Sequence, residues 1–146
     1  MLSDFKIITP TTESEMQAYY DIRFSELREP WGQPVGSERD SIDNECVHRM
    51  IISKSVFIGV VCLQYNDISQ AQIRYMAVKR EYQGQGFGKL LIDDLEKIAK
   101  ENSVKEIILQ SREVAVDFYK SLGYQLEKKT YLLFNDIQHF LMRKYL

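Results

Sequence analysis

The chain has 146 residues, 45% of them hydrophobic and 27% charged, which suits one compact domain that needs no disulfide or metal to stabilise it. The formal net charge of -2 argues against a nucleic-acid-binding protein, since such proteins usually carry a basic face. No apolar run approaches the roughly 20 residues that cross a bilayer, and the N-terminal segment lacks the apolar stretch of a signal peptide. We therefore expect a single cytoplasmic domain over residues 1–146, with neither nucleic acid nor a membrane as partner.

Cysteine usage argues against a metal centre. Cys46 and Cys62 are the only cysteines and form no C-x-x-C pair. Cys46 and His48 form one C-x-H pair, but the chain has no matching second pair and only two His, which disfavours a structural zinc site. Cys62 lies in an apolar segment, where a buried core role is expected. We predict no bound metal.

The N-terminal part begins with a strand and a helix. Residues 5–10 alternate in polarity and end at a proline, which predicts a strand. Thr12 and Glu15 form a capping box that begins a helix. One face of this helix is apolar at the 3.6-residue period: Met16, Tyr20, Phe24 and Leu27. Prolines and glycines then predict a loop over residues 29–40.

The middle of the chain predicts a central sheet. Ser37 or Ser41 would cap a short second helix within residues 38–45. The three segments that follow are nearly continuously apolar, as expected for strands of a buried sheet: residues 47–53, 55–65 and 71–78.

The C-terminal half alternates helices and strands. A long helix ending near residue 102 has an apolar face: Phe87, Leu91, Leu95 and Ile98. Four elements complete the chain: a strand over 104–110, a short helix over 112–123 that stops at Gly123, and strands over 124–134 and 137–146 around an Asn135-Asp136 turn. The order predicts an α/β (α+β) fold.

Three of the seven glycines lie in one loop between a strand and a helix: Gly84, Gly86 and Gly88. Helix N-termini expose N–H groups and a partial positive charge, which attract phosphate. A P-loop is excluded, because Gln83 stands at its first glycine and Leu90 replaces its hydroxyl residue. A Rossmann fingerprint is disfavoured, because Lys89 stands at its third glycine. A turn that binds nothing would need one glycine, so we predict that the loop backbone contacts an anion.

Two motifs support a specific family. Gln83-x-x-Gly86-x-Gly88 resembles the Q/R-x-x-G-x-G/A signature of the GNAT superfamily of N-acyltransferases, and residues 115–124, "AVDFYKSLGY", resemble that family's A-x-x-F-Y-x-x-x-G-F/Y stretch. The resemblance covers roughly residues 71–145. It implies a GNAT-like fold with a central mixed, mostly antiparallel sheet of about seven strands and four helices. It also implies direct transfer of an acetyl group from acetyl-CoA, the acyl donor, to a primary amine.

The resemblance also implies roles for individual residues. The strand before the loop would bind the pantetheine arm and the oxyanion through backbone groups of Met76, Ala77 and Val78. The loop would bind the pyrophosphate of coenzyme A: Gln83, Gly84, Gln85, Gly86, Phe87, Gly88 and Lys89. Tyr119 falls on the family's general acid, and Phe118 is its neighbour in the motif. Arg112 stands where many relatives have Asn, and it would either reach the cofactor or face water.

Several points stay open at the level of the sequence. The general base is one of a set in which His139 is favoured: Glu26, Asp43, Glu45, His48 and His139. Trp31 would either close its loop or influence acceptor choice. The acceptor is a small-molecule amine or a protein amine, and a homodimer is one option for assembly. The alternative to an enzyme is a non-catalytic acyl-CoA-binding sensor module, which the retention of Tyr119 in its motif disfavours.

Overall fold

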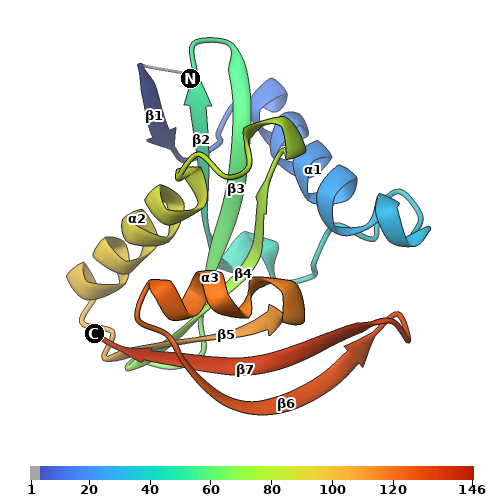
Figure 1. The fold of residues 1–146 in the computed structure, drawn as a ribbon. Helices are drawn as coiled ribbons and strands as arrows, with labels where there is room; N and C mark the ends of the chain where they lie inside the picture. Colours follow the sequence, from blue (N-terminus) through green and yellow to red (C-terminus); the bar gives the residue numbers. More distant parts are fainter. Residues whose placement is uncertain (1–3) are drawn as a thin grey trace. The chain divides into compact units, whose positions relative to one another are not determined.

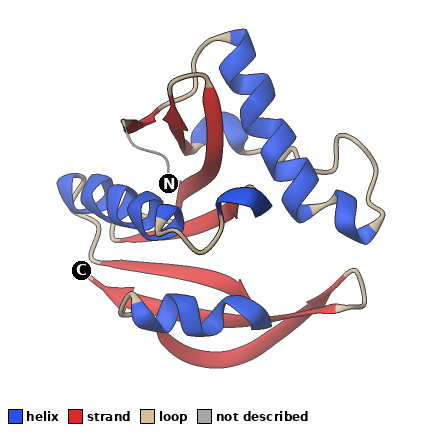
Figure 2. Cartoon of the chain, turned by 45° about the horizontal axis from the view of Figure 1, so that its top comes forward, coloured by secondary structure: helices blue, strands red, loops and turns tan. Residues whose placement is uncertain are grey.

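The computed structural model describes residues 4–146, which form seven strands and three α-helices (Figures 1 and 2). The elements are β1 (Phe5–Ile8), α1 (Glu13–Leu27), β2 (Val47–Ser53), β3 (Val56–Tyr65), β4 (Gln70–Val78), α2 (Phe87–Glu101), β5 (Glu106–Arg112), α3 (Val116–Ser121), β6 (Gln125–Leu133) and β7 (Ile137–Tyr145). The predicted number and order of the strands are confirmed. None of the helices in this described part is long and apolar enough to cross a membrane.

The expected second helix over residues 38–45 is wrong. This segment forms turns and one short 3₁₀ turn, Asp43–Glu45. Short polar side chains bond to the nearby backbone instead: Ser37 Oγ donates to the Pro34 carbonyl at 2.6 Å, and Asp40 Oδ1 accepts from the Ile42 amide at 3.1 Å. Such local bonds compete with a helix and stabilise turns, so the fold has three α-helices rather than four.

The sheet is mixed, because it combines parallel and antiparallel pairs of strands. Its strands follow the order β1-β2-β3-β4-β5-β7-β6. The β4–β5 pair is parallel, from Gln70 opposite Glu106 to Ile73 opposite Leu109. Parallel neighbours need a crossover connection, and α2 supplies it between these two strands. The pairs β1–β2, β2–β3, β5–β7 and β6–β7 are antiparallel.

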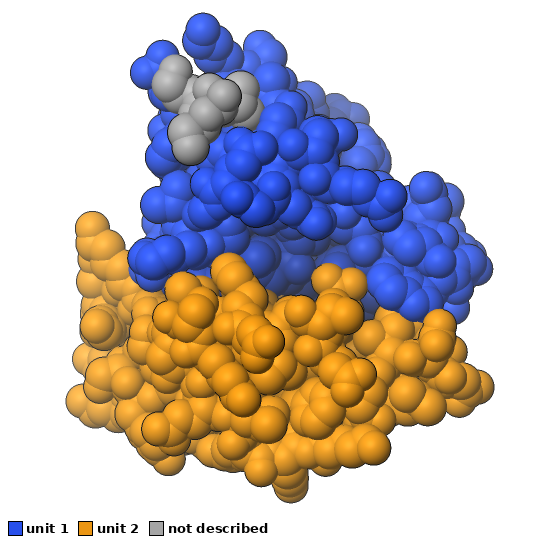
Figure 3. All heavy atoms as spheres, viewed as in Figure 1, with its two compact units in different colours: residues 1–63, 75–95 blue, residues 64–74, 96–146 orange. Residues whose placement is uncertain are grey.

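The chain forms two compact units, coloured separately in Figure 3. The first comprises residues 1–63 and 75–95, and the second comprises residues 64–74 and 96–146. The division runs through β3, β4 and α2, because each of these elements contributes residues to both units.

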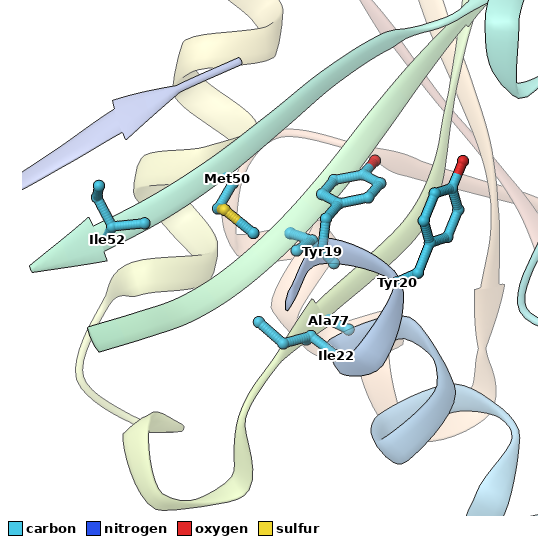
Figure 4. Packing of buried hydrophobic residues seen from close by; sticks show 7 residues of the cluster. Tyr19, Tyr20, Ile22, Met50, Ile52 and Ala77 are labelled. Atoms are coloured by element: carbon cyan, nitrogen blue, oxygen red, sulfur yellow. The ribbon is translucent and has the colours of Figure 1, made fainter. Parts of the chain in front are cut away.

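The core of the first unit joins α1 to strands of the sheet. Thr12 and Glu15 form the predicted capping box at the start of α1. One cluster of buried side chains connects α1 with β2, β3 and β4 (Figure 4): Tyr19, Tyr20, Ile22, Met50, Ile52, Val60 and Ala77. Burial of each large apolar side chain contributes about 1.5–3 kcal/mol, so this cluster fixes α1 against the sheet.

The helix α2 covers the other face of the sheet in the first unit. Successive residues of a strand point to opposite faces. Met50 of β2 packs in the α1 cluster, whereas its neighbour Arg49 forms a 2.7 Å ion pair with Asp94 of α2. Phe87 at the start of α2 packs edge-on against Phe5 of β1, with ring centroids 5.8 Å apart. These contacts fix the start of α2, which directly follows the glycine loop, against β1 and β2.

The second unit contains the hairpin β6–β7 beside β5, with α3. Glu96 is buried and receives hydrogen bonds from the Tyr124 hydroxyl at 2.8 Å and from Lys144 Nζ at 2.9 Å. Gly123 adopts φ +96° directly after α3, as predicted for a helix stop. The strand β6 lies at the edge of the sheet and its register against β7 shifts at two places.

Candidate active site

The glycine loop has a conformation that glycine alone adopts easily. Gly84 has φ +77° and Gly86 has φ +90°. A Cβ atom added at either residue would meet no heavy atom within 4 Å. The glycines are therefore required by the backbone conformation rather than by close packing, and the space beside the main chain is open to a ligand.

The start of α2, directly after the two glycines, has backbone N–H groups that make no hydrogen bond within the helix. The first helical hydrogen bond runs from the Leu90 amide to the Gly86 carbonyl at 3.2 Å. The amides of Phe87 and Gly88 therefore have no acceptor within the helix. The first turn of α2 contains no acidic residue. Such a helix end suits an anion of the size and charge of a pyrophosphate.

Gln83 links the loop to the end of β4. Its side-chain Nε2 donates to the Val78 carbonyl at 2.9 Å. The Phe87 side chain is buried, so this residue offers only its amide to a ligand. Gln85 is exposed, with its side-chain amide 3.4 Å from the Glu81 carbonyl. The first unit thus brings the loop and the strand end Met76–Val78 together.

Close packing of backbone positions the end of β4. Ala77 and Val78 are buried, and the Lys79 amide donates to the Ile58 carbonyl at 2.9 Å. A Cβ at Gly59 of β3 would lie 3.0 Å from the Ala77 carbonyl oxygen. Only glycine at this position lets the two strands approach so closely.

The second unit holds Tyr119, Phe118 and Arg112. Tyr119 lies in α3 with 7% of its surface exposed, and its ring packs edge-on against those of Phe118 and Tyr124 at centroid distances of 5.0 and 5.9 Å. Burial raises the pKa of Tyr119 to about 12, and the positive charge of Arg112 acts in the opposite direction. The phenol is therefore protonated at neutral pH and can donate a proton.

Both histidines considered as a base are held by hydrogen bonds. His139, the favoured candidate, is 6% exposed, donates from Nδ1 to the Ile137 carbonyl at 2.9 Å and stacks on the Tyr131 ring at 4.5 Å. His48 donates from Nε2 to the Asp43 carbonyl at 2.6 Å, and its Nδ1 lies 2.7 Å from the Tyr19 hydroxyl. The general base stays unassigned among these residues.

A buried arginine is the main feature that the sequence does not predict. Arg23 is 0% exposed on a helix face expected to be apolar. Its Nη1 lies 3.1 Å from both carboxylate oxygens of Asp43, and its Nη2 donates to the Tyr19 hydroxyl at 3.2 Å. Within residues 4–146, Arg23 Nε is buried without a hydrogen-bond partner. No short-range pattern could reveal this arginine, because Asp43, the partner of its charge, lies in the loop after α1, 20 residues along the chain.

Three residues of the first unit have the chemistry of metal ligands. Asp43, His48 and Cys62 offer ligand atoms within 4.8 Å of one another. The Asp43 carboxylate is, however, paired with the Arg23 guanidinium, whose charge would repel a cation. A hydrogen bond with Cys46, together with burial, raises the pKa of the Cys62 thiol, which disfavours the thiolate that a metal needs. The geometry therefore gives no reason to replace the prediction of a metal-free protein.

Comparison with known proteins identifies a family. The model of the acetyltransferase (GNAT) family matches residues 16–124. A Bacillus subtilis (strain 168) protein named as an acetyltransferase is 27% identical over 137 residues, which cover 92% of this chain and 92% of that protein.

Solved structures share the fold over nearly the whole chain. An N-acetyltransferase structure from Lactobacillus plantarum has a TM-score of 0.86 at 20% identity and covers 99% of both chains. A GNAT family acetyltransferase from Elizabethkingia anophelis, solved with acetyl-CoA bound, has a TM-score of 0.77 at 17% identity and covers 99% of both chains. These likenesses concern the fold alone.

Proposed function

The chain belongs to the GNAT family of acetyltransferases, enzymes that use acetyl-CoA, and from this premise we propose that residues 1–146 act as one domain that moves the acetyl group directly to a primary amine. The observation that carries the proposal is the glycine loop: two left-handed glycines, open space beside them and backbone amides at the start of α2.

The loop supplies the affinity for the acyl donor. Backbone amides of residues 83–89 bind the pyrophosphate, because several N–H groups and the helix dipole act on the same compact anion. Gln83 contributes indirectly, through the side chain that holds the loop to Val78. Lys89 lies in the first turn of α2, where its ammonium pairs with the Asp93 carboxylate at 2.7 Å.

The end of β4 supplies orientation and charge stabilisation. Backbone groups of Met76, Ala77 and Val78 bind the pantetheine arm, and one N–H among them donates to the acetyl carbonyl oxygen as negative charge develops there. Fixed amides are suited to this task, since they need no reorganisation during the reaction. The tight packing of Gly59 against Ala77 keeps these groups in place.

Tyr119 supplies the proton for the leaving thiolate. Its raised pKa keeps the hydroxyl protonated across the range in which an enzyme works. Arg112 lies in the same unit, and its positive charge lowers that pKa. Phe118 contacts the cofactor beside it. The acceptor amine must lose a proton to a base or to water.

The test is an acetyl-transfer assay against a panel of amines. The panel contains small primary amines and peptides with a free α-amino group, and release of the coenzyme A thiol is followed by a colorimetric thiol reagent. We expect transfer to at least one of these two classes of amine, with initial-rate plots that indicate a ternary complex. Mass spectrometry should detect no acetylated form of the enzyme itself. Binding of acetyl-CoA by calorimetry without any transfer would support the sensor alternative, and absence of binding would refute the proposal.

A further inference from the structure

Tyr75 has an unusual backbone conformation inside a strand. Its φ is +52°, in the left-handed region, although it lies within β4 between Arg74 and Met76. Aromatic residues rarely adopt this conformation, and it persists only where the surroundings hold it. Tyr75 directly precedes Met76–Val78, the residues whose backbone the proposed function uses.

Side chains from outside the strand contact the face of the Tyr75 ring and its hydroxyl. The Arg23 guanidinium carbon lies 4.1 Å from the centroid of the Tyr75 ring, which is the geometry of a cation–π contact. The Tyr75 hydroxyl donates to Asp40 Oδ2 at 3.0 Å. The ring is therefore fixed by its face and by its hydroxyl.

These contacts close into a ring of interactions. Asp43 pairs with Arg23 and also accepts from the Asp40 amide at 2.9 Å. The path Arg23–Asp43–Asp40–Tyr75 returns to Arg23 through the cation–π contact. A change in any member therefore loosens the hold on Tyr75.

A second ring fixes Arg23 itself. Arg23 donates to the Tyr19 hydroxyl at 3.2 Å, Tyr19 lies 2.7 Å from His48 Nδ1, and His48 Nε2 donates to the Asp43 carbonyl. Figure 4 shows that the Tyr19 and Tyr20 hydroxyls lie on the same side of the apolar cluster. The Arg23–Asp43 ion pair is partly buried, with the Arg23 side chain 0% and the Asp43 side chain 11% exposed, and apolar residues of similar volume often stabilise a protein as well as such a pair does. Within residues 4–146, the buried Arg23 Nε also lacks a hydrogen-bond partner, which is a cost to stability. We therefore expect that Arg23 has a role other than stabilising the fold.

We propose that Arg23 and Tyr75 are positioning residues for acetyl transfer. The interactions of Arg23 and Asp40 hold Tyr75 in its left-handed conformation, and this conformation sets the direction of the β4 backbone amides that follow it. The acetyl carbonyl is then polarised by an amide whose orientation depends on residues of α1 and its following loop. The inference rests on the proposed function of Met76–Val78.

Three substitutions of Tyr75 separate positioning from packing. Tyr75→Phe keeps the ring and loses one hydrogen bond, Tyr75→Gly keeps the backbone conformation accessible, and Tyr75→Val opposes it because a β-branched residue disfavours positive φ. We expect kcat to fall least for Phe, about 10-fold for Gly and about 100-fold for Val, since misplacement of about 1 Å can cost 100-fold. The Kd of acetyl-CoA should change less than about threefold, because the loop supplies most of the affinity.

Comparison of kcat between Tyr75→Gly and Tyr75→Val decides whether Tyr75 is a positioning residue or only a packing residue. If Tyr75 were only a packing residue, Gly would leave the larger cavity and would be the more damaging substitution. A kcat for Val equal to or above that for Gly, with both proteins folded by thermal melting, overturns the inference. An inactive wild-type protein that does not bind acetyl-CoA overturns the proposed function instead, so the two failures are distinguishable.

Vibrational spectroscopy measures directly how strongly the acetyl carbonyl is polarised. The C=O stretch of bound acetyl-CoA, labelled with ¹³C at the acetyl carbonyl, should shift to lower frequency in the wild type and return toward the free value in Tyr75→Val. Arg23→Lys, which loses the planar face, should show the same return, whereas Arg49→Lys, at another partly buried ion pair, should not. An unchanged shift in Tyr75→Val would contradict a positioning role.

Discussion

The side-chain amide of Gln83 donates a hydrogen bond of 2.9 Å to the carbonyl oxygen of Val78. This hydrogen bond joins the glycine loop to the end of β4, and the two segments are proposed to bind different parts of acetyl-CoA. We expect Gln83→Ala to lower the free energy of unfolding by about 1 kcal/mol and to weaken acetyl-CoA binding several-fold. Urea denaturation and calorimetry measure the two effects.

Gln33 provides a matched control for this contact. Its side-chain amide donates to the Trp31 carbonyl at 3.3 Å, also as a partly buried bond from a side chain to the backbone. Gln33→Ala should change stability comparably and leave the Kd of acetyl-CoA unaltered. Equal losses of acetyl-CoA affinity in the two variants would contradict a specific role for Gln83.

Gly86→Val should weaken acetyl-CoA binding by at least about 10-fold, equivalent to about 1.4 kcal/mol, while the protein stays folded. The new side chain lies in open space but disfavours the φ of +90°, so the loop amides turn away from the pyrophosphate. Gly36→Val is the control, because Gly36 has φ +103° and is equally open. Unchanged affinity in Gly86→Val, measured by calorimetry, would refute the site.

Gly59→Ala should destabilise the protein by about 1–3 kcal/mol and lower kcat. The added Cβ would lie 3.0 Å from the Ala77 carbonyl oxygen, a backbone atom that cannot rotate away, and 3.3 Å from Leu91 Cδ1. The end of β4 must therefore move away from β3. Thermal melting and initial rates test this, and a variant with wild-type stability and kcat would show that the close approach is dispensable.

Tyr119→Phe should lower kcat by about 10- to 100-fold, at the low end of what general acids contribute. The Kd of acetyl-CoA should stay nearly the same, because the ring still packs between Phe118 and Tyr124. Full kcat in the variant, under conditions where chemistry limits the rate, would make Tyr119 a packing residue only.

The raised pKa of Tyr119 has a second consequence for stability. The folded protein favours the neutral phenol, with a pKa of about 12, whereas an exposed tyrosine has a pKa of about 10. The stability that this difference provides is present below pH 10 and is lost as the pH rises toward 12. Tyr119→Phe should therefore show less alkaline destabilisation between pH 10 and 12 in urea titrations, and an identical loss in both proteins would contradict the burial effect.

Removal of metals should leave activity unchanged. The Asp43 carboxylate is already paired with Arg23, and thioester chemistry needs no metal ion. Dialysis against EDTA, followed by assay with and without added Zn²⁺ or Mg²⁺, measures this. Activity lost with EDTA and restored by one of these ions would show that the prediction is wrong.

Local signals in the sequence predict much of the fold. The capping box of Thr12 and Glu15 and the glycine stop at Gly123 act over a few residues, and both are present in the structure. The second helix fails for a similarly local reason, since Ser37 and Asp40 bond to nearby backbone and favour turns.

The site depends more on distant contacts, and these could not be read from the sequence. Arg23 lies on a face expected to be apolar, and it is buried because Asp43, 20 residues along the chain, pairs with it. The left-handed conformation of Tyr75 has no signal in a run of strand-forming residues. Resemblance to a family motif indicates which residues are proposed to act in the reaction, but the contacts that hold these residues come from the tertiary structure.

The two register shifts in β6 affect how the protein behaves at high concentration. A strand at the edge of a sheet can pair with the same strand of another molecule and begin an aggregate. In β6, the shifts lie between Leu126 and Lys128 and between Lys129 and Leu132, which interrupts the regular row of hydrogen-bonding groups. The two lysines would also bring like charges together in such a pairing. This edge, although it exposes leucine and tyrosine side chains, is thereby a poor template for fibrils.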